Sequence, residues 1–422
     1  MIYNAGMKIR AMLGYPSVLC GVLLFVAAVS AAAEPATTGR VLRCRFKAVP
    51  PQYRGIAVFD ALAIGHDGSL YLGTSTYGSP ANLIRYNRSN DQVTAVCDVS
   101  LAIGENPGQI IPSGKIHSQL QVAADGKVYF GSHLGCDRAM TGEHPSPYGG
   151  GHFICYDPST GACRDLGRAY HNDSVMRVEL DEPRQKLYGL TYPSAHLIVK
   201  DLQTGAIVDK GQAAHHGYAM PMLFADGRAY FFSRAGRLAR FDPDVGTIEE
   251  VLEHGAPPQA DGPLGDDWFY YTSMIRGLSR DRREVVGVIR YGKRQFLYRF
   301  RIAAGLLRRP AFDWLAEVPP EANAVVRAPD DSVYLYAWNR NRVFHYDARR
   351  RQTRDLGIVT DDKDQQARIL WPACFDQDGT LHFGGVMDTE ADRFKASGYG
   401  LGALGFFTIA TGTLQQAVRE TR

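Results

Sequence analysis

The sequence lacks an excess of charge of either sign. Lys and Arg number 47 and Asp and Glu number 44 among 422 residues, giving a formal net charge of +3. Two of the positive charges, Lys8 and Arg10, lie in an N-terminal segment that we expect to be removed, which leaves +1. Nucleic-acid binding normally requires a basic surface that neutralises phosphates. The composition therefore argues against a nucleic-acid partner, and an anionic ligand must be held by a few locally placed cations.

Long hydrophobic runs are also missing. The run Val18–Val29 has 12 residues, too few to span a bilayer as a helix. It follows Lys8 and Arg10 and precedes Ala31-Ala32-Ala33, which is the order of a basic start, an apolar core and a small-residue cleavage site. We therefore expect residues 1–33 to be a secretory signal peptide. The mature chain is then exported, periplasmic or secreted, and we expect it to have no membrane span and to be a monomer.

Cysteine is sparse as well. Six of the seven cysteines remain after the signal peptide. Cys155 and Cys163 flank the turn Asp157–Gly161, and export to an oxidising compartment favours a disulfide across this hairpin. The alternative is that these residues are structural or free thiols. The other pairings cannot be derived from spacing alone.

What the sequence does contain is a repeat. Asp-Gly between two apolar runs indicates a tight β-hairpin, and Asp67-Gly68 recurs in this setting three more times, at residues 125–126, 226–227 and 378–379. With three weaker copies, hairpin turns are predicted to begin at Asp67, Asp125, Asp181, Asp226, Asp281, Asp330 and Asp378. A second hairpin follows each copy, so each unit has four short strands, A to D, with a period of about 45 to 58 residues. Seven such antiparallel units predict an all-β fold, a seven-bladed β-propeller, as one domain over residues 34–422.

Three segments outside the repeat are predicted to be one closing strand and two surface loops. Val41–Phe46 is predicted to be an extra strand that closes the ring. Residues 134–151 and 253–272 are rich in Gly, Pro and polar side chains and are predicted to be surface loops. No helical periodicity of useful length is present.

Reactive side chains gather where the repeat predicts one mouth of the central channel. In a propeller blade, strand A starts and strand B ends at the same mouth. His117 and His133 lie eight residues before and eight after Asp125, and Tyr218 and Arg234 are placed in the same way about Asp226. Each pair is therefore expected to face across the mouth. Aligning the B strands puts one row of residues there, namely Ser75, His133, Tyr192, Arg234, Trp338 and Val386.

These residue types suit β-elimination from a uronate. The reaction removes the weakly acidic C5 proton beside a carboxylate, and Arg234 can neutralise that carboxylate with two parallel hydrogen bonds. Tyr218 or His117 is predicted to take the proton, and the other, or His133, to protonate the departing oxygen. The alternative is that these are strand-end residues satisfied by loop carbonyls. Further residues predicted to bind substrate are Tyr192, Gln119 and Trp338.

Two motifs carry a resemblance to a known family. Lys115-Ile116-His117-Ser118 and Val128–His133, followed by a Tyr and an Arg one hairpin apart, resemble the seven-bladed propeller polysaccharide lyases, especially the ulvan lyases. The resemblance implies an anionic uronate polysaccharide as substrate. It also implies an active site of two His residues from one blade with a Tyr and an Arg from a later one, which match His117, His133, Tyr218 and Arg234. Tyr192 is an alternative to Tyr218, because variable loops set the spacing.

Other readings stay open. Oligogalacturonate lyases share the propeller and hold a divalent metal through His and Gln side chains, a role that His117, Gln119 and His133 would take here. A second set of metal-type ligands, suited to zinc but not to any compact finger, is His133, Cys136, His144 and His152. The pair His215-His216 is assigned to a solvated loop. Two further alternatives are that the chain is an enzyme similar to virginiamycin lyase, or that it is a non-catalytic exported propeller that binds a glycan or a protein.

Overall fold

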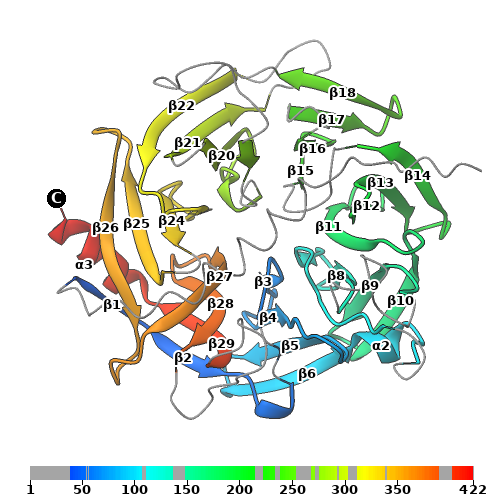
Figure 1. The fold of residues 1–422 in the computed structure, drawn as a ribbon, viewed down its shortest axis with the longest axis horizontal. Coiled ribbons are helices and arrows are strands. Elements are labelled where there is room, and N and C mark those ends of the chain that lie inside the picture. Colours follow the sequence, from blue (N-terminus) through cyan, green and yellow to red (C-terminus); the bar gives the residue numbers. More distant parts are fainter. Residues whose placement is uncertain are drawn as a thin grey trace, which may run out of the picture.

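The computed structural model shows seven β-sheets arranged as the blades of a propeller around a central channel (Figure 1). It describes residues 39–53, 55, 57–106, 111–135, 148–213, 222–232, 238–252, 268–270, 275–291, 294–302, 311–337, 340–388 and 402–421. The predicted signal peptide, residues 1–33, lies outside these ranges. Within them, no helix has the length and apolar character needed to cross a bilayer.

Blades 1 to 3 each contain four consecutive antiparallel strands. Blade 1 consists of β3 (Leu62–Ile64), β4 (Leu70–Gly73), β5 (Asn82–Asn87) and β6 (Gln92–Asp98). Blade 2 consists of β7 (Gln121–Val122), β8 (Val128–Gly131), β9 (His152–Asp157) and β10 (Ala162–Arg168). Blade 3 consists of β11 (Ser174–Asp181), β12 (Lys186–Tyr192), β13 (His196–Asp201) and β14 (Ile207–Gln212). A single helical turn, α2 (Val99–Ala102), follows β6.

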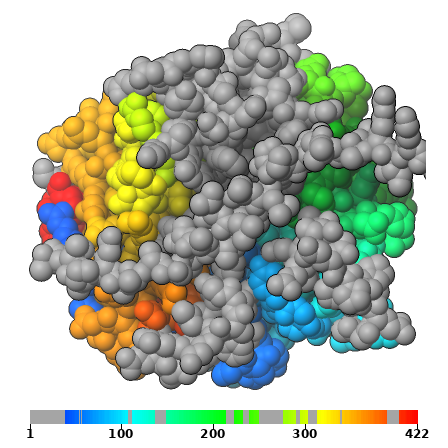
Figure 2. Space-filling view, in the orientation of Figure 1, coloured from blue at the N-terminus to red at the C-terminus, as the bar shows by residue number. Residues whose placement is uncertain are grey.

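Blades 4 to 7 complete the ring. Blade 4 consists of β15 (Met222–Ala225), β16 (Arg228–Phe232), β17 (Leu238–Asp242) and β18 (Thr247–Leu252). Blade 5 consists of β19 (Trp268–Tyr270), β20 (Glu284–Tyr291), β21 (Arg294–Arg301) and β22 (Ala311–Val318), with the short helix η4 (Ile275–Gly277) before β20. Blade 6 contains β23 (Ala324–Arg327), β24 (Val333–Ala337), β25 (Arg342–Asp347) and β26 (Gln352–Thr360). Blade 7 contains β27 (Ala367–Phe375), β28 (Leu381–Met387) and β29 (Ala403–Ile409). In Figure 2, blades 6 and 7 (yellow to orange) lie to the left and blades 1 and 2 (blue to cyan) lie at the lower right.

The predicted A–B turns are confirmed in all seven blades. In the Asp-Gly copies the glycine has a positive φ, for example 74° at Gly68 and 86° at Gly126, a conformation that costs glycine little. In three of these copies the Asp side chain accepts a backbone N–H two residues later, as Asp67 does from Ser69 at 3.0 Å. Local turn chemistry therefore sets the strand boundaries that the repeat predicted.

Ring closure differs in detail from the prediction. The leader Val41–Phe46 does not form one strand, because it divides into β1 (Val41–Arg43) and β2 (Arg45–Ala48). Strand β1 adds to blade 6 in parallel with β26, whereas β2 pairs with β29 and becomes the fourth strand of blade 7. The N-terminal segment therefore closes the ring across two neighbouring blades. The C-terminal helix α3 (Thr411–Glu420) lies beside β1 and β26 (Figure 1) and buries Leu414.

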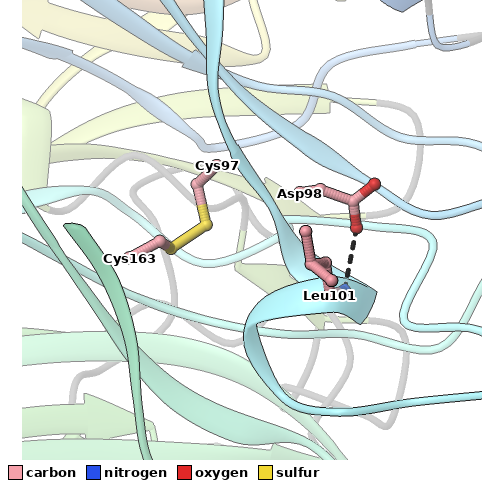
Figure 3. The surroundings of a disulfide bond; sticks show 4 residues. All are labelled: Cys97, Asp98, Leu101 and Cys163. Carbon is pink, nitrogen blue, oxygen red and sulfur yellow. Dashed lines mark hydrogen bonds between the residues drawn. A yellow bond between two sulfur atoms is a disulfide. The ribbon is translucent and has the colours of Figure 1, made fainter. Parts of the chain in front are cut away.

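The disulfide joins two blades, so the predicted Cys155–Cys163 bridge is wrong. Cys97 at the end of β6 is bonded to Cys163 in β10, with their Cα atoms 5.7 Å apart (Figure 3). In the β9–β10 register, Cys163 lies opposite Tyr156 while Cys155 lies opposite Arg164. Because neighbouring side chains on a strand point to opposite faces, Cys155 and Cys163 lie on different faces of blade 2. Cys44, Cys155 and Cys374 are free thiols.

Candidate active site at the channel mouth

A ribbon of backbone pairing extends beyond the named strands at the mouth between blades 1 and 2. Antiparallel bridges join Ala57 to Ser75, Ser75 to Lys115, and Lys115 to His133. The N–H of Lys115 donates to the His133 carbonyl at 3.0 Å, and the N–H of His133 donates back at 2.8 Å. Directly paired residues place their side chains on the same face of a sheet. Blades 1 and 2 therefore present one continuous row of side chains here.

Four aromatic rings stack side by side along this arc. The ring centroids of His117 and His133 are 5.2 Å apart, and those of His133 and Tyr192 are 5.6 Å apart. Phe59 stacks on the other side of His117 at 4.2 Å, with an interplanar angle of 6°. The structure thus brings together His117 and His133, as predicted from their distances to the A–B turn, and Tyr192, as predicted from the alignment of the B strands. Phe59 was missed, although it lies eight residues before Asp67, the same offset that His117 has from Asp125.

His133 has a defined tautomer. Its Nδ1 lies 3.0 Å from the carbonyl oxygen of Leu134, and a carbonyl can only accept a hydrogen bond. Nδ1 therefore carries the proton, and in the neutral ring the lone pair is on Nε2. The side chain is buried, with 2% exposure. An imidazole held in this way is suited to accept a proton at Nε2.

His117 is held in its neutral form. Burial lowers its pKa well below the usual value, and the positive charges of protonated His133, Arg177 and Lys115 lower it further. Its Nδ1 is buried and has no hydrogen-bond partner among the described residues. His117 is therefore neutral, and not an imidazolium, near neutral pH.

A buried ion pair lies beneath the histidines. Arg177 in β11 and Asp60, which precedes β3, are 2.6 Å apart, and their side chains are 0% and 4% exposed. Arg177 also donates to the carbonyls of Met176 at 3.0 Å and His117 at 3.5 Å. Burial raises the pKa of Asp60, and the charge of Arg177 opposes this shift. Sequence reasoning missed the pair, although a lone Arg within the apolar run of β11 was a signal for it.

Gln119 lies deeper in the channel than His117. It is 2% exposed, its Oε1 accepts the N–H of Val178 at 3.4 Å, and its Nε2 has no partner among the described residues. Gln119 lines a cavity of about 240 Å³ together with Leu62, Arg276, Arg327 and Ala373, among others. Arg276 reaches across from blade 5 and donates to carbonyls of blades 1 and 7, those of Asp60 and Leu62 at 2.7 and 3.3 Å and that of Ala373.

Two sets of residues are predicted as metal ligands. In the described part of the chain, no group of three or more His, Cys, Asp or Glu side chains is arranged to hold a metal. In the set of His117, Gln119 and His133, the Oε1 of Gln119 accepts a backbone N–H, while the hydrogen bond from Nδ1 of His133 to a carbonyl leaves its Nε2 available to a proton or a metal alike. His152 instead pairs with Asp165 at 2.9 Å. Several predicted residues lie outside the described ranges, namely Cys136, His144, His215, His216, Tyr218, Arg234 and Trp338.

Comparison with solved structures supports the architecture. The chain is similar to virginiamycin B lyase from Staphylococcus aureus with quinupristin (12% identity, TM-score 0.54, covering 87% of this chain and 99% of that one). It is also similar to an oligogalacturonate lyase in complex with manganese (12%, TM-score 0.54, 88% and 98%). A chain of the mitotic checkpoint complex is nearly as similar (10%, TM-score 0.52, 96% and 99%). No protein-family model matches the sequence, and no curated protein does.

These values establish the fold alone. Lyases are among the structural neighbours, but so is a chain of the mitotic checkpoint complex. Because one fold serves many functions, the site must decide the activity.

Proposed function

We propose that this protein is an exported polysaccharide lyase that cleaves a uronate-containing polysaccharide by β-elimination, as its resemblance to the ulvan lyases implies. The observation that carries the proposal is the His117–His133 pair at the channel mouth, with rings 5.2 Å apart and one tautomer fixed by Leu134. Two buried imidazoles in contact suit a proton transfer, because His is the side chain used most often for general acid–base catalysis.

The proposed reaction is a β-elimination across C4 and C5 of the uronate. Nε2 of His133 takes the C5 proton, and the electrons of the C5–H bond form the C4–C5 double bond. The bond from C4 to the glycosidic oxygen breaks, and Tyr218 protonates the departing oxygen, because the neutral imidazole of His117 is too weak an acid for this role. Arg234 pairs with the carboxylate, whose enolate character grows as the proton leaves, so the pairing strengthens in the transition state. Tyr192, Gln119 and Trp338 remain our candidates for substrate binding.

The test is a screen across uronate polysaccharides that follows the ultraviolet absorbance of the unsaturated product. On the polymer that the wild-type chain cleaves, we expect His133→Ala, Tyr218→Phe and Arg234→Ala each to lower kcat by about 10²–10³-fold or more. Arg234→Lys should not restore the wild-type rate, because it keeps the charge but loses the planar fork. His152→Ala is the matched control, since His152 pairs with Asp165 and takes no part in the row of rings.

Retention of near-wild-type rates by Arg234→Ala and Tyr218→Phe on a confirmed substrate would show that these two residues are not in the active site. If no uronate polymer gives product while a glycan or protein ligand is recovered in binding assays, the protein is a non-catalytic propeller.

A second candidate is elimination on a streptogramin B antibiotic. The similarity to virginiamycin B lyase with quinupristin favours including it, although at 12% identity that similarity concerns the fold. Incubation with quinupristin, followed by mass spectrometry of the linearised product, tests this activity in the same series of experiments.

A further inference from the structure

Lys115 occupies the centre of the row at the channel mouth. Its backbone pairs with Ser75 on one side and with His133 on the other. The Ser75 pairing lacks direct mutual hydrogen bonds, since Thr76 N–H donates to Gly114 and Ile116 N–H donates to Thr74. This is the type of antiparallel pair in which the two side chains approach most closely. Ser75, Lys115 and His133 therefore present adjacent side chains on one face.

The ammonium group of Lys115 lies over an aromatic ring. Its Nζ is 4.4 Å from the ring centroid of Tyr77, while the residue as a whole is 3% exposed. A cation–π contact stabilises a desolvated ammonium. Tyr77 itself is 36% exposed, so it connects the buried lysine with the molecular surface. The charge of Lys115 also reaches the catalytic pair, because it lowers the pKa of His117.

A polar atom beside this lysine lacks a partner. Ser75 is 0% exposed, and its Oγ has no hydrogen-bond partner among the described residues. A buried hydroxyl left unsatisfied costs about 1–3 kcal/mol, so such an atom indicates a ligand or an ordered water. An anion between Lys115 and Ser75 would accept from both donors.

We propose that Lys115, Ser75 and Tyr77 form a subsite for the carboxylate of an acidic sugar, next to His133 and on the opposite side of it from Tyr192. The sugar ring lies against Tyr77, and its carboxylate accepts hydrogen bonds from Lys115 Nζ and Ser75 Oγ. This subsite rests on the proposed function for its substrate class, and it selects a second uronate of the polymer beside the one bound by Arg234. Lys115 is accordingly a specificity residue, and it takes no proton in the reaction.

The test is a binding experiment on the whole mature chain carrying His133→Ala, which prevents turnover. The probes are tetraglucuronate and its carboxyl-reduced, neutral counterpart, titrated by calorimetry. Adding Lys115→Gln should weaken tetraglucuronate binding about 10- to 100-fold and leave the neutral sugar unchanged, because a hydrogen bond to a charged group contributes roughly 1.5–3 kcal/mol. Lys115→Arg should recover much of the affinity. Lys127→Gln, at the A–B turn of the same blade, is the matched control and should change neither Kd.

Tyr77→Leu provides a second route if Lys115→Gln does not fold, and we expect it to weaken tetraglucuronate binding about 3- to 10-fold. The subsite is refuted if the parent does not bind tetraglucuronate, or if Lys115→Gln weakens the acidic and the neutral sugar equally or neither of them. Failure of the proposed function is a separate result, the absence of unsaturated product from the wild-type chain, because binding is measured in an inactive variant.

Discussion

Glu179 is a carboxylic acid buried where the inner strands of three blades meet. It belongs to β11 of blade 3, it is 2% exposed, and it accepts hydrogen bonds from Phe224 N–H of blade 4 at 3.2 Å and from Gln121 Nε2 of blade 2 at 3.3 Å. Burial raises its pKa to about 8, against the opposing charges of Arg282 and Arg177. The residue is therefore largely protonated in the folded protein at neutral pH.

Glu179→Gln should change the pH dependence of stability. A carboxyl whose pKa is raised in the folded state does not lower the free energy of unfolding below its unfolded pKa. Its cost in unfolding free energy grows as the pH rises towards the folded pKa of about 8. At about 1.4 kcal/mol per pKa unit, this cost reaches roughly 4 kcal/mol. We expect the free energy of unfolding of the variant, relative to wild type, to increase between pH 5 and 8 and then to level off in urea titrations.

A matched control for Glu179 is Glu317→Gln. Glu317 is an accessible acid whose pKa is lowered by its ion pair with Arg294. The stabilisation from this ion pair is present above the unfolded pKa of Glu317 and is lost only on acidification. The free energy of unfolding of Glu317→Gln relative to wild type should therefore be constant from pH 5 to 8. A flat difference for Glu179→Gln over that range as well would show that Glu179 is ionised in the folded protein.

At the scale of elements, the disulfide ties the outer edges of blades 1 and 2. Cys97 and Cys163 are 66 residues apart, and closing a loop of that length in the unfolded chain is worth about 4 kcal/mol in the entropic model. The double variant Cys97→Ala/Cys163→Ala should therefore lose roughly 3–4 kcal/mol of unfolding free energy. Denaturant titrations with and without reductant check this. Reductant should destabilise wild type and not the variant, and equal midpoints for all four samples would contradict the prediction.

Sequence patterns predicted the turns and the facing pairs within a blade, and they missed the contacts between blades. Four Asp-Gly turns fix strand boundaries within a few residues and set the period that locates the three weaker copies, so all seven A–B turns and the facing of His117 and His133 were predicted. The Cys155–Cys163 bridge was wrong because the register of β9 and β10 puts the two residues on opposite faces. The Asp60–Arg177 pair and the Ser75–Lys115 bridge join different blades, and one repeat carries no information about which of its residues meet another repeat.

At the scale of the whole molecule, side chains cross the channel as well as the seams between blades. Asp60 and Arg177 connect blades 1 and 3, and Arg276 of blade 5 donates to carbonyls of blades 1 and 7. In a ring where each sheet contacts only its two neighbours, two features hold the ring together. One is the packing between adjacent blades, and the other is the strand that joins the last blade to the N-terminal segment. These cross-channel contacts fix the inner strands directly, and Arg177 also donates to the carbonyl of His117.

The closure is β2, which forms the outer edge of blade 7. Phe46 packs on Phe407 with ring centroids 4.8 Å apart, and Gly405 leaves the space that β2 occupies, since a Cβ there would overlap Lys47 O and the Phe46 ring. On the other side, Arg45 and Lys47 pair with Asp91 of blade 1 at 2.8 and 2.6 Å. These ion pairs are exposed and contribute little each, so backbone pairing and Phe46 carry the closure.

Deleting residues 34–48 should therefore open the ring. About four backbone hydrogen bonds at roughly 1 kcal/mol each, with about 2 kcal/mol for burying Phe46, give a loss of about 6 kcal/mol, and β29 becomes an unpaired edge. We expect a lower denaturation midpoint and concentration-dependent association in light scattering. A synthetic peptide spanning Gly39–Val49 should restore the midpoint when added in excess, because an edge strand binds a matching segment by β-augmentation. A peptide in which Phe46 is replaced by Asp should not. If the deleted chain unfolds at the wild-type midpoint and stays monomeric, then β2 does not close this propeller and the seams between blades suffice.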